Sequence, residues 1–236
     1  MATCPNGAVT NGGEHHNRDL SLCRNCGKCT EVCSAKARVM SGQVMTVEEV
    51  MKVVRKDELF YWNSGGGVTF GGGEPTSAGD FLIALLEACR EQGYHTCVDT
   101  CGFCAPELFK KVLGLTELFL FDCKHMDPEQ HRRLTGQDNA IILTNLRELL
   151  RSGVPVHIRV PLMPGLNDSE ENIAAMAALL HEFGREEVDV LPSHSFGKSK
   201  YAALDRDVPD VRSYDPAELK EALDRFARHG LKTSVV

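Results

Sequence analysis

The stretch Ser64-Gly65-Gly66-Gly67-Val68-Thr69-Phe70-Gly71-Gly72-Gly73-Glu74-Pro75 places a short β-prone run between two glycine clusters. Valine, threonine and phenylalanine favour a short buried strand, and the three glycines after it permit positive φ and let a ligand approach the bare backbone. A tight strand-to-helix connection is the plainer interpretation, because glycine-rich turns are common and only some of them bind a ligand. The rest of the chain must therefore decide what this turn does.

Length and composition limit the class of protein. A chain of 236 residues with 42% hydrophobic content can bury one large α/β core, with or without a small appendage. The formal charge of -7 has acids and bases interspersed, which argues against nucleic acid and favours a protein partner. Because the sequence has neither a membrane-length apolar run nor a signal peptide at its start, we expect no membrane association and a cytoplasmic location.

The cysteines indicate a metal site in the first part of the chain. Five of the ten cysteines lie within the first 33 residues, in a stretch rich in glycine and asparagine. Cys23, Cys26, Cys29 and Cys33 form a C-x2-C-x2-C-x3-C run, which is typical of a [4Fe-4S] cluster. Zinc usually takes two C-x2-C pairs separated by a longer stretch. The sequence therefore predicts an incomplete, ferredoxin-like auxiliary iron–sulfur module over residues 1–42 and a larger domain over residues 43–236.

The fourth cluster ligand has two candidates. Cys4-Pro5 is the usual ending of such a run, and residues 33–37 echo residues 4–8. In two-cluster ferredoxins the fourth cysteine of each run binds the other cluster, so Cys4 would complete the set begun by Cys23, Cys26 and Cys29. Alternatively, Cys33 completes that set and Cys4 stays free. The sequence does not choose between them.

Beyond the glycine-rich turn, strand and helix patterns alternate, which predicts parallel strands covered by helices. Before the turn, apolar spacing from Thr46 predicts a helix that runs to about Trp62. Further helices are predicted at 81–93, 106–113, 139–152, 169–183 and 216–229. Strands are predicted at 68–70, 95–100, 117–122, 156–161, 188–192 and 232–236.

The predicted strands repeatedly end in charged or polar residues. In parallel α/β folds ligands bind at the carboxyl ends of the strands. Each residue alone has an ordinary explanation, such as a rim salt bridge or a solvated loop. Together they would suit a zwitterionic ligand that carries hydroxyl groups. The set comprises Gly72, Gly73, Glu74, Asp99, Thr100, Asp122, Lys124, Arg159 and His194.

An iron–sulfur module followed by GGGEP, DTCG, DCKH, IRVPLMPGLND and LPSHSFGKSKY resembles the glycyl-radical-enzyme activating enzymes of the radical S-adenosylmethionine (SAM) superfamily. The resemblance covers roughly the whole chain. It implies a partial (β/α) TIM-like barrel that holds SAM beside a [4Fe-4S] cluster. Reduced by flavodoxin or ferredoxin, such an enzyme cleaves SAM to a 5′-deoxyadenosyl radical, which takes hydrogen from a backbone glycine of a partner glycyl radical enzyme.

The resemblance also implies roles for the strand-end residues. Gly72, Gly73 and Glu74 match the turn that meets the methionine amine of SAM. The other matches are Asp122 and Lys124 near the carboxylate and ribose, Arg159 before the V-P pair, His194 by the ribose, and Asp99 with Thr100 near the carboxylate and a monovalent cation.

Two departures from the family pattern bear on activity. Gly71 stands where the family usually has serine. The family's C-x3-C-x2-C motif and first barrel strand would precede residue 1, so we expect an N-terminally truncated member that lacks the first strand and the catalytic cluster cysteines. Cys97, Cys101 and Cys104 do show C-x3-C-x2-C spacing. However, the first two stand about 13 Å apart along a strand, which favours small apolar residues in the sheet over cluster ligands.

The sequence thus supports three hypotheses. The first is a radical SAM activase. The second is a catalytically inactive iron–sulfur or partner-binding protein of the same lineage, and the third is a zinc-stabilised α/β protein. The sequence does not predict which glycyl radical enzyme is the partner.

Overall fold

The computed structural model describes residues 4–9, 18–194, 200–201, 207 and 212–236. The chain divides into two compact units. One unit is Met1–Thr46 with Lys200–Asp207, and the other is Val47–Ser199 with Val208–Val236. No helix in the described ranges is long and apolar enough to cross a membrane.

The N-terminal unit has almost no apolar core. Among its described residues, Ala8 alone is buried, while Val32, Val39 and Met40 are exposed. Its helix α1 (Lys28–Glu31) is a single turn, which follows Gly27 in the left-handed region. An antiparallel bridge joins Val9 to Arg18. A segment with so little buried apolar surface needs another source of stability, and a metal cluster is the usual one.

The larger unit is built on a parallel sheet in which the six strands lie in sequence order. Because every connection between neighbouring strands is a crossover, the carboxyl ends of all the strands lie at the same edge of the sheet. The strands are β1 (Gly67–Phe70), β2 (His95–Thr100), β3 (Leu118–Asp122), β4 (Val156–Leu162), β5 (Glu187–Pro192) and β6 (Lys232–Val235).

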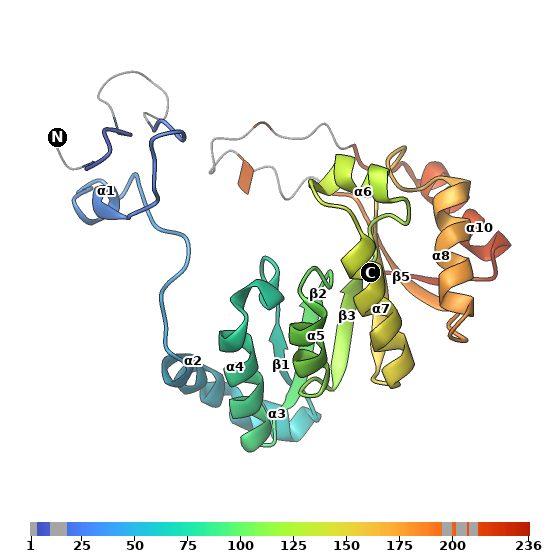
Figure 1. The fold of residues 1–236 in the computed structure, drawn as a ribbon, viewed down its shortest axis with the longest axis horizontal. Coiled ribbons are helices and arrows are strands. Elements are labelled where there is room, and N and C mark those ends of the chain that lie inside the picture. Colours follow the sequence, from blue (N-terminus) through green and yellow to red (C-terminus); the bar gives the residue numbers. More distant parts are fainter. Residues whose placement is uncertain (1–3, 10–17, 195–199, 202–206, 208–211) are drawn as a thin grey trace. The chain divides into compact units, whose positions relative to one another are not determined.

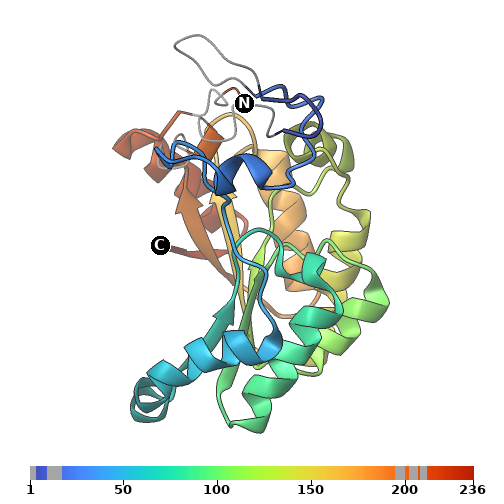
Figure 2. The ribbon, with the colours of Figure 1, turned by 90° about the vertical axis from the view of Figure 1, so that its left-hand side faces the viewer.

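Helices α4, α5, α7 and α8 stand side by side along one face of this sheet (Figure 1). The view at right angles shows the same four helices together on one side of the strands (Figure 2). The α-helices of the unit are α2 (Val47–Val54), α3 (Glu58–Ser64), α4 (Asp80–Glu91), α5 (Pro106–Leu113), α6 (Pro128–Thr135), α7 (Ala140–Ser152), α8 (Glu170–His181) and α10 (Pro216–Arg228). Short 3-10 turns lie at Arg55–Asp57 and Pro75–Ala78.

The two faces of the sheet differ in chemistry. Side chains that point toward the helices, such as Phe119, Phe121 and Val160, are fully buried in the main core. The alternate positions are less buried, and along β3 and β4 they include Asp122 and Arg159. A parallel sheet normally buries apolar residues on both faces, so this polar face is the part of the fold that can meet a polar ligand.

The predicted α/β fold with a parallel sheet is confirmed, and β2 and α5 have the predicted bounds. The single helix predicted from Thr46 to Trp62 is wrong, because the 3-10 turn Arg55–Asp57 divides that segment into α2 and α3. Helix α6 was not predicted, because its only fully buried side chain is His131 and it has no apolar repeat to detect. Whether the sheet forms part of a barrel stays a prediction.

We predict that Gly67→Ala destabilises the larger unit by about 3 kcal/mol or more. A Cβ atom at Gly67 would lie 1.9 Å from the carbonyl oxygen of His95, so β1 would have to move away from β2. Gly73→Ala is the matched control, because nothing lies within 4 Å of its Cβ position and its φ is not positive. Thermal unfolding of both variants measures the effect, and equal melting temperatures would contradict the prediction.

Candidate functional site

The candidate site lies at the carboxyl-end edge of the sheet, where most of the predicted residues meet. Asp122 on β3 pairs in register with Arg159 on β4, which in turn pairs with Asp189 on β5. In a parallel sheet, paired residues point to the same face. The register therefore places an acid on each side of Arg159.

Arg159 joins three strands through its guanidinium group. Its Nη2 bonds Oδ1 of Asp99 and lies 2.7 Å from Oδ1 of Asp122, and its Nε lies 3.0 Å from the same Asp122 oxygen. The Arg159 side chain is 17% exposed, so the charge is largely withdrawn from water and depends on both carboxylates. The Oδ2 atoms of Asp99 and Asp122 accept no hydrogen bond from the described residues.

The glycine turn lies beside this ion-pair network. A Cβ atom at Gly71 would lie 3.4 Å from Cβ of Asp99 and 3.8 Å from its Oδ2. A serine would therefore fit at Gly71, and lack of space does not explain its absence. Gly72 has a φ of 117°, which favours glycine, and both Gly72 and Gly73 are exposed with open space at their Cβ positions. The turn thus presents bare backbone to a ligand.

Glu74 uses its carboxylate to fasten the turn to the end of β2. Its Oε1 accepts hydrogen bonds from the hydroxyls of Thr76 (2.8 Å) and Thr100 (2.6 Å), and its Oε2 accepts one from the backbone N–H of Cys101 (2.9 Å). The Cys101 thiol, 3.0 Å away, donates to the same Oε2. Burial alone would raise the pKa of Glu74, but the bonds from Thr100, Cys101 and Thr76 together hold it below its ordinary value.

The charge of Lys124, in the loop after β3, acts on Asp122 at the end of β3 and on the Cys101 thiol just after β2. Burial raises the pKa of Asp122 and raises that of Cys101 to about 11, and the positive charge of Lys124 opposes both shifts. No hydrogen bond or ion pair joins the Lys124 ammonium to the described residues. Lys124 therefore offers an unpaired cation at the site, next to carboxylates that are already bound to Arg159.

The remaining predicted residue, His194, is exposed just after β5. The structure thus brings together the glycine turn, Glu74, Thr100, Asp99, Asp122, Lys124 and Arg159, and places His194 at the end of a neighbouring strand.

The structure does not gather Cys97, Cys101 and Cys104 into a metal site. Cys97 is buried on β2, the Cys101 thiol donates to Glu74, and Cys104 accepts from the Asn145 amide at 4.0 Å. Across the described ranges, no group of three or more His, Cys, Asp or Glu side chains is placed to hold a metal ion. The C-x3-C-x2-C spacing of these three residues therefore has a structural explanation.

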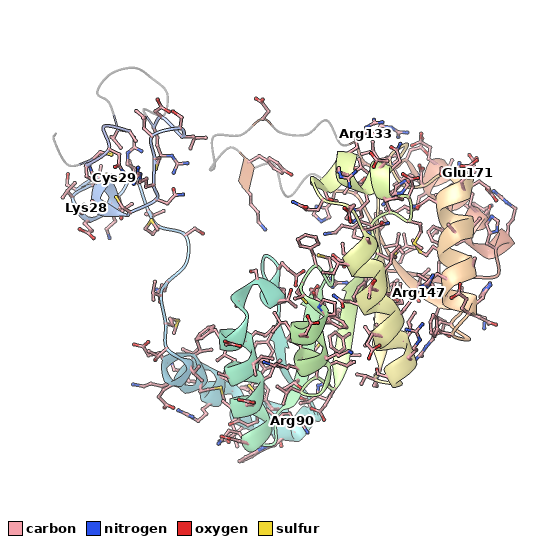
Figure 3. All side chains as sticks on the ribbon, in the orientation of Figure 1. Lys28, Cys29, Arg90, Arg133, Arg147 and Glu171 are labelled. Carbon is pink, nitrogen blue, oxygen red and sulfur yellow. The ribbon has the colours of Figure 1, made fainter. Side chains whose placement is uncertain are left out.

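The N-terminal cysteines have the chemistry of cluster ligands but are not assembled around a centre. Cys4, Cys23, Cys26, Cys29 and Cys33 are free thiols, and Cys26 is exposed. The backbone N–H of Asn6, with smaller contributions from Ala8, Val9 and Gly7, lowers the pKa of Cys4. This favours the thiolate form, which binds iron. The donor set fits an iron–sulfur cluster, and the assignment of each ligand stays a prediction. Figure 3 shows Cys29 on helix α1.

Sequence analysis missed two groups of polar side chains, one that bonds the loops after the strands and one on the polar face of the sheet. Four buried asparagines, at positions 139, 145, 167 and 172, hydrogen-bond to the loops that follow the strands. In addition, Nδ1 of His157 lies 2.8 Å from Oδ2 of Asp189 on the polar face. A buried asparagine cannot be told from a surface one by its sequence, although Asn167 lies in the PGLND motif.

Comparison with known proteins identifies the class. A sequence profile of the radical SAM superfamily matches residues 23–177. SuiB from Streptococcus suis, solved with SAM, superposes with a TM-score of 0.62 over 84% of this chain and 45% of its own, which at 16% identity shows the fold alone. The chain belongs to the radical SAM superfamily.

More similar relatives narrow this class to the activating enzymes of glycyl radical enzymes. The isethionate sulfite-lyase activating enzyme of Oleidesulfovibrio alaskensis is 40% identical over 89% of this chain and 69% of its own length. The 4-hydroxyphenylacetate decarboxylase activating enzyme of Clostridioides difficile is 34% identical over 97% and 74%. A domain of pyruvate-formate lyase-activating enzyme from Bacteroides vulgatus superposes with a TM-score of 0.60 at 32% identity, over 72% of this chain and 99% of that one. The resemblance seen in the sequence is confirmed.

We predict that Arg159→Met lowers the free energy of unfolding by about 3 kcal/mol at neutral pH, because Asp99 and Asp122 lose their shared cation. Burial already raises the pKa of Asp122, and without the opposing charge of Arg159 that pKa rises further above its unfolded value. Ionisation of Asp122 then opposes folding, so the loss shrinks as the pH falls from neutral to mildly acidic and Asp122 becomes protonated.

Arg147→Met on α7 is the control (Figure 3), since the Arg147–Glu182 pair is exposed and 3.4 Å long. We expect this control to change stability by less than about 0.5 kcal/mol at either pH. Chemical denaturation at both pH values measures the difference, and an Arg159→Met loss that does not depend on pH would contradict the prediction.

Proposed function

We propose that this chain is a radical SAM activase, which binds SAM at the carboxyl-end edge of the sheet and generates a glycyl radical on a partner enzyme. The observation that carries the proposal is that the unpaired Lys124 ammonium belongs to the same sheet edge as the exposed glycine turn and the Asp99–Arg159–Asp122 network. A zwitterion fits this arrangement, because its carboxylate can pair with Lys124 while its amine meets the turn carbonyls and the free carboxylate oxygens.

Each residue has a distinct role in this proposal. Gly72 and Gly73 bring their backbone against the methionine amine, and Glu74 with Thr100 holds that turn in place. Lys124 binds the methionine carboxylate, and Asp122 and His194 bind the ribose hydroxyls. Arg159 holds the carboxylates of Asp99 and Asp122 in place through its hydrogen bonds, and Asp99 with Thr100 borders a monovalent cation.

The iron–sulfur chemistry is assigned to the N-terminal cysteines by their donor set. We assign a [4Fe-4S] cluster to Cys23, Cys26 and Cys29 with either Cys33 or Cys4, in an auxiliary module over residues 1–42. In the family, a SAM-bound cluster supplies the electron that cleaves SAM and so provides the radical that takes hydrogen from glycine. We further propose that residues 43–236 form a partial barrel, that flavodoxin or ferredoxin is the reductant, and that the protein works in the cytoplasm.

A second function is favoured by one observation. Cys97, Cys101 and Cys104 are committed to the sheet and its hydrogen bonds, so the catalytic C-x3-C-x2-C motif of the family has no equivalent in the larger unit as described. A protein without that motif would be an inactive iron–sulfur or partner-binding protein of the same lineage. SAM binding by the strand-end residues is expected under both functions, while SAM cleavage is expected only under the first.

We predict that the anaerobically reconstituted chain binds SAM and that Lys124→Met weakens this binding roughly tenfold or more, because the ligand carboxylate loses a charge-assisted hydrogen bond. Equilibrium binding with radiolabelled SAM measures the affinity. Lys111→Met, a change on the exposed side of α5, is the matched control. Failure of the wild type to bind SAM would refute the proposed site. Release of 5′-deoxyadenosine under a strong reductant decides between activase and inactive homologue.

We predict that iron loading depends on the N-terminal cysteines alone. Cys26→Ala should lower the iron and acid-labile sulfide of the reconstituted protein from about four atoms each per chain. Cys97→Ala should leave both unchanged, because Cys97 is buried in the sheet. Comparing Cys4→Ala with Cys33→Ala identifies the fourth ligand. Iron loss in Cys97→Ala would contradict the assignment, and stoichiometric zinc without sulfide would exclude both iron–sulfur hypotheses.

A further inference from the structure

The loop that carries Lys124 leaves β3 at Asp122 and reaches α6 at Pro128. Within it, the residues from Lys124 to Met126 belong to no helix or strand, so their peptide groups have no ladder to join. The side chain of Lys124 is a flexible four-carbon stem, and where its charge can reach depends on where its backbone is held.

Three buried asparagine side chains hold that backbone. Asn167 Nδ2 donates to the carbonyl oxygen of Lys124 at 2.9 Å. Asn139 Nδ2 donates to the next two carbonyl oxygens, those of His125 at 2.9 Å and Met126 at 2.7 Å. Asn172 Oδ1 accepts from the backbone N–H of Met126 at 2.8 Å. Three consecutive carbonyl groups and one N–H of the loop are thus bound by amide side chains. We call Asn139, Asn167 and Asn172 the asparagine clamp.

The clamp also ties this loop to the loop after β4. Asn167 Nδ2 donates to the carbonyl oxygen of Pro161 at 2.8 Å, and its Oδ1 accepts from the N–H of Met163 at 2.8 Å. Asn172 Nδ2 donates to the carbonyl oxygen of Asn167 at 2.7 Å. Lys124 is therefore fixed relative to the strand that carries Arg159. Exposed fractions of 2–4% keep water from competing for these bonds.

Asn139 shows that the clamp has its own role. This residue is the N-cap of α7, a position where asparagine normally bonds the first free N–H groups of the helix. Its side chain makes no such bond. Instead, Asp138 Oδ1 accepts from the N–H of Ala140 at 3.1 Å, while both donors of the Asn139 amide group are directed to the Lys124 loop. If Asn139 served only to start α7, its side chain would accept a hydrogen bond from the first free N–H groups of that helix.

We infer that Asn139, acting with Asn167 and Asn172, is a positioning residue that sets the location of the Lys124 ammonium and thereby the affinity for the carboxylate of SAM. The inference rests on the proposed function, in which Lys124 binds that carboxylate. It assigns no contact between the asparagines and SAM.

The test replaces Asn139 with residues that are equally good N-caps but lack the amide donors. Asn139→Asp and Asn139→Ser preserve the capping preference of α7, so a purely helix-starting role predicts unchanged binding. We expect either variant to weaken SAM binding roughly tenfold, the usual effect of a lost buried hydrogen bond. Gln137→Glu makes the same amide-to-carboxylate change at an exposed position just before α7 and should bind SAM like the wild type.

A double-mutant cycle decides whether Asn139 acts through Lys124. If it does, Lys124→Met combined with Asn139→Ser should bind SAM no more weakly than Lys124→Met alone. Multiplying losses would overturn the inference, as would wild-type affinity in both single Asn139 variants. Hydrogen exchange supplies a readout that needs no ligand. We expect faster exchange of the amides of residues 123–127 in Asn139→Ser, with α7 unchanged.

The outcomes separate the inference from the function beneath it. A wild-type protein without affinity for SAM would refute the proposed function. In that case the exchange data would still show whether Asn139 holds the loop. Faster exchange throughout α7 would assign Asn139 to helix stability and would overturn the positioning role.

Discussion

The loops after β2 and β3 contain peptide groups that join no neighbouring strand, and the candidate site depends on how those groups are hydrogen-bonded. In the loop after β2, the Glu74 carboxylate accepts a hydrogen bond from the N–H of Cys101. The Asn145 amide donates to the carbonyl oxygens of Gly102 and Cys104 in the same loop. The asparagine clamp hydrogen-bonds three carbonyl oxygens and one N–H of the loop after β3. Buried peptide groups without partners are costly, so these side chains fix the loops that the ladder cannot reach.

This arrangement separates the groups that shape the site from the groups left to bind a ligand. The carboxylate of Glu74 is occupied by hydrogen bonds to Thr100 and Cys101, which lower its pKa. Glu74 therefore holds the glycine turn in place and is not left to bind a ligand. Arg159 likewise is committed to Asp99 and Asp122. What remains is the bare turn backbone, one oxygen of each aspartate and the Lys124 ammonium. A ligand with both an amine and a carboxylate matches this remainder.

The sequence predicted the parallel α/β sheet because the patterns that indicate it are local. Alternating apolar runs in β2 and the amphipathic pattern of α5 each follow from a few adjacent residues, and parallel order follows from their alternation. Helix α6 was missed because His131 is its only buried side chain, which leaves no apolar repeat to detect. The break between α2 and α3 was missed because no proline or glycine marks it in the sequence. The strand ends were found because charges there contradict the apolar expectation for a buried sheet.

The hydrogen-bond partners of those strand-end residues could not be predicted from the sequence, because the contacts form only when distant segments pack together. Arg159 lies 60 positions from Asp99 and 37 from Asp122, and only the register of three strands brings them together. The same holds for Asn172 and Met126, which are 46 positions apart. The sequence pattern of one element does not indicate which residue of a distant element it will contact. A motif can therefore name the residue that meets a ligand, while the residues that hold it in place emerge only when the loops are packed.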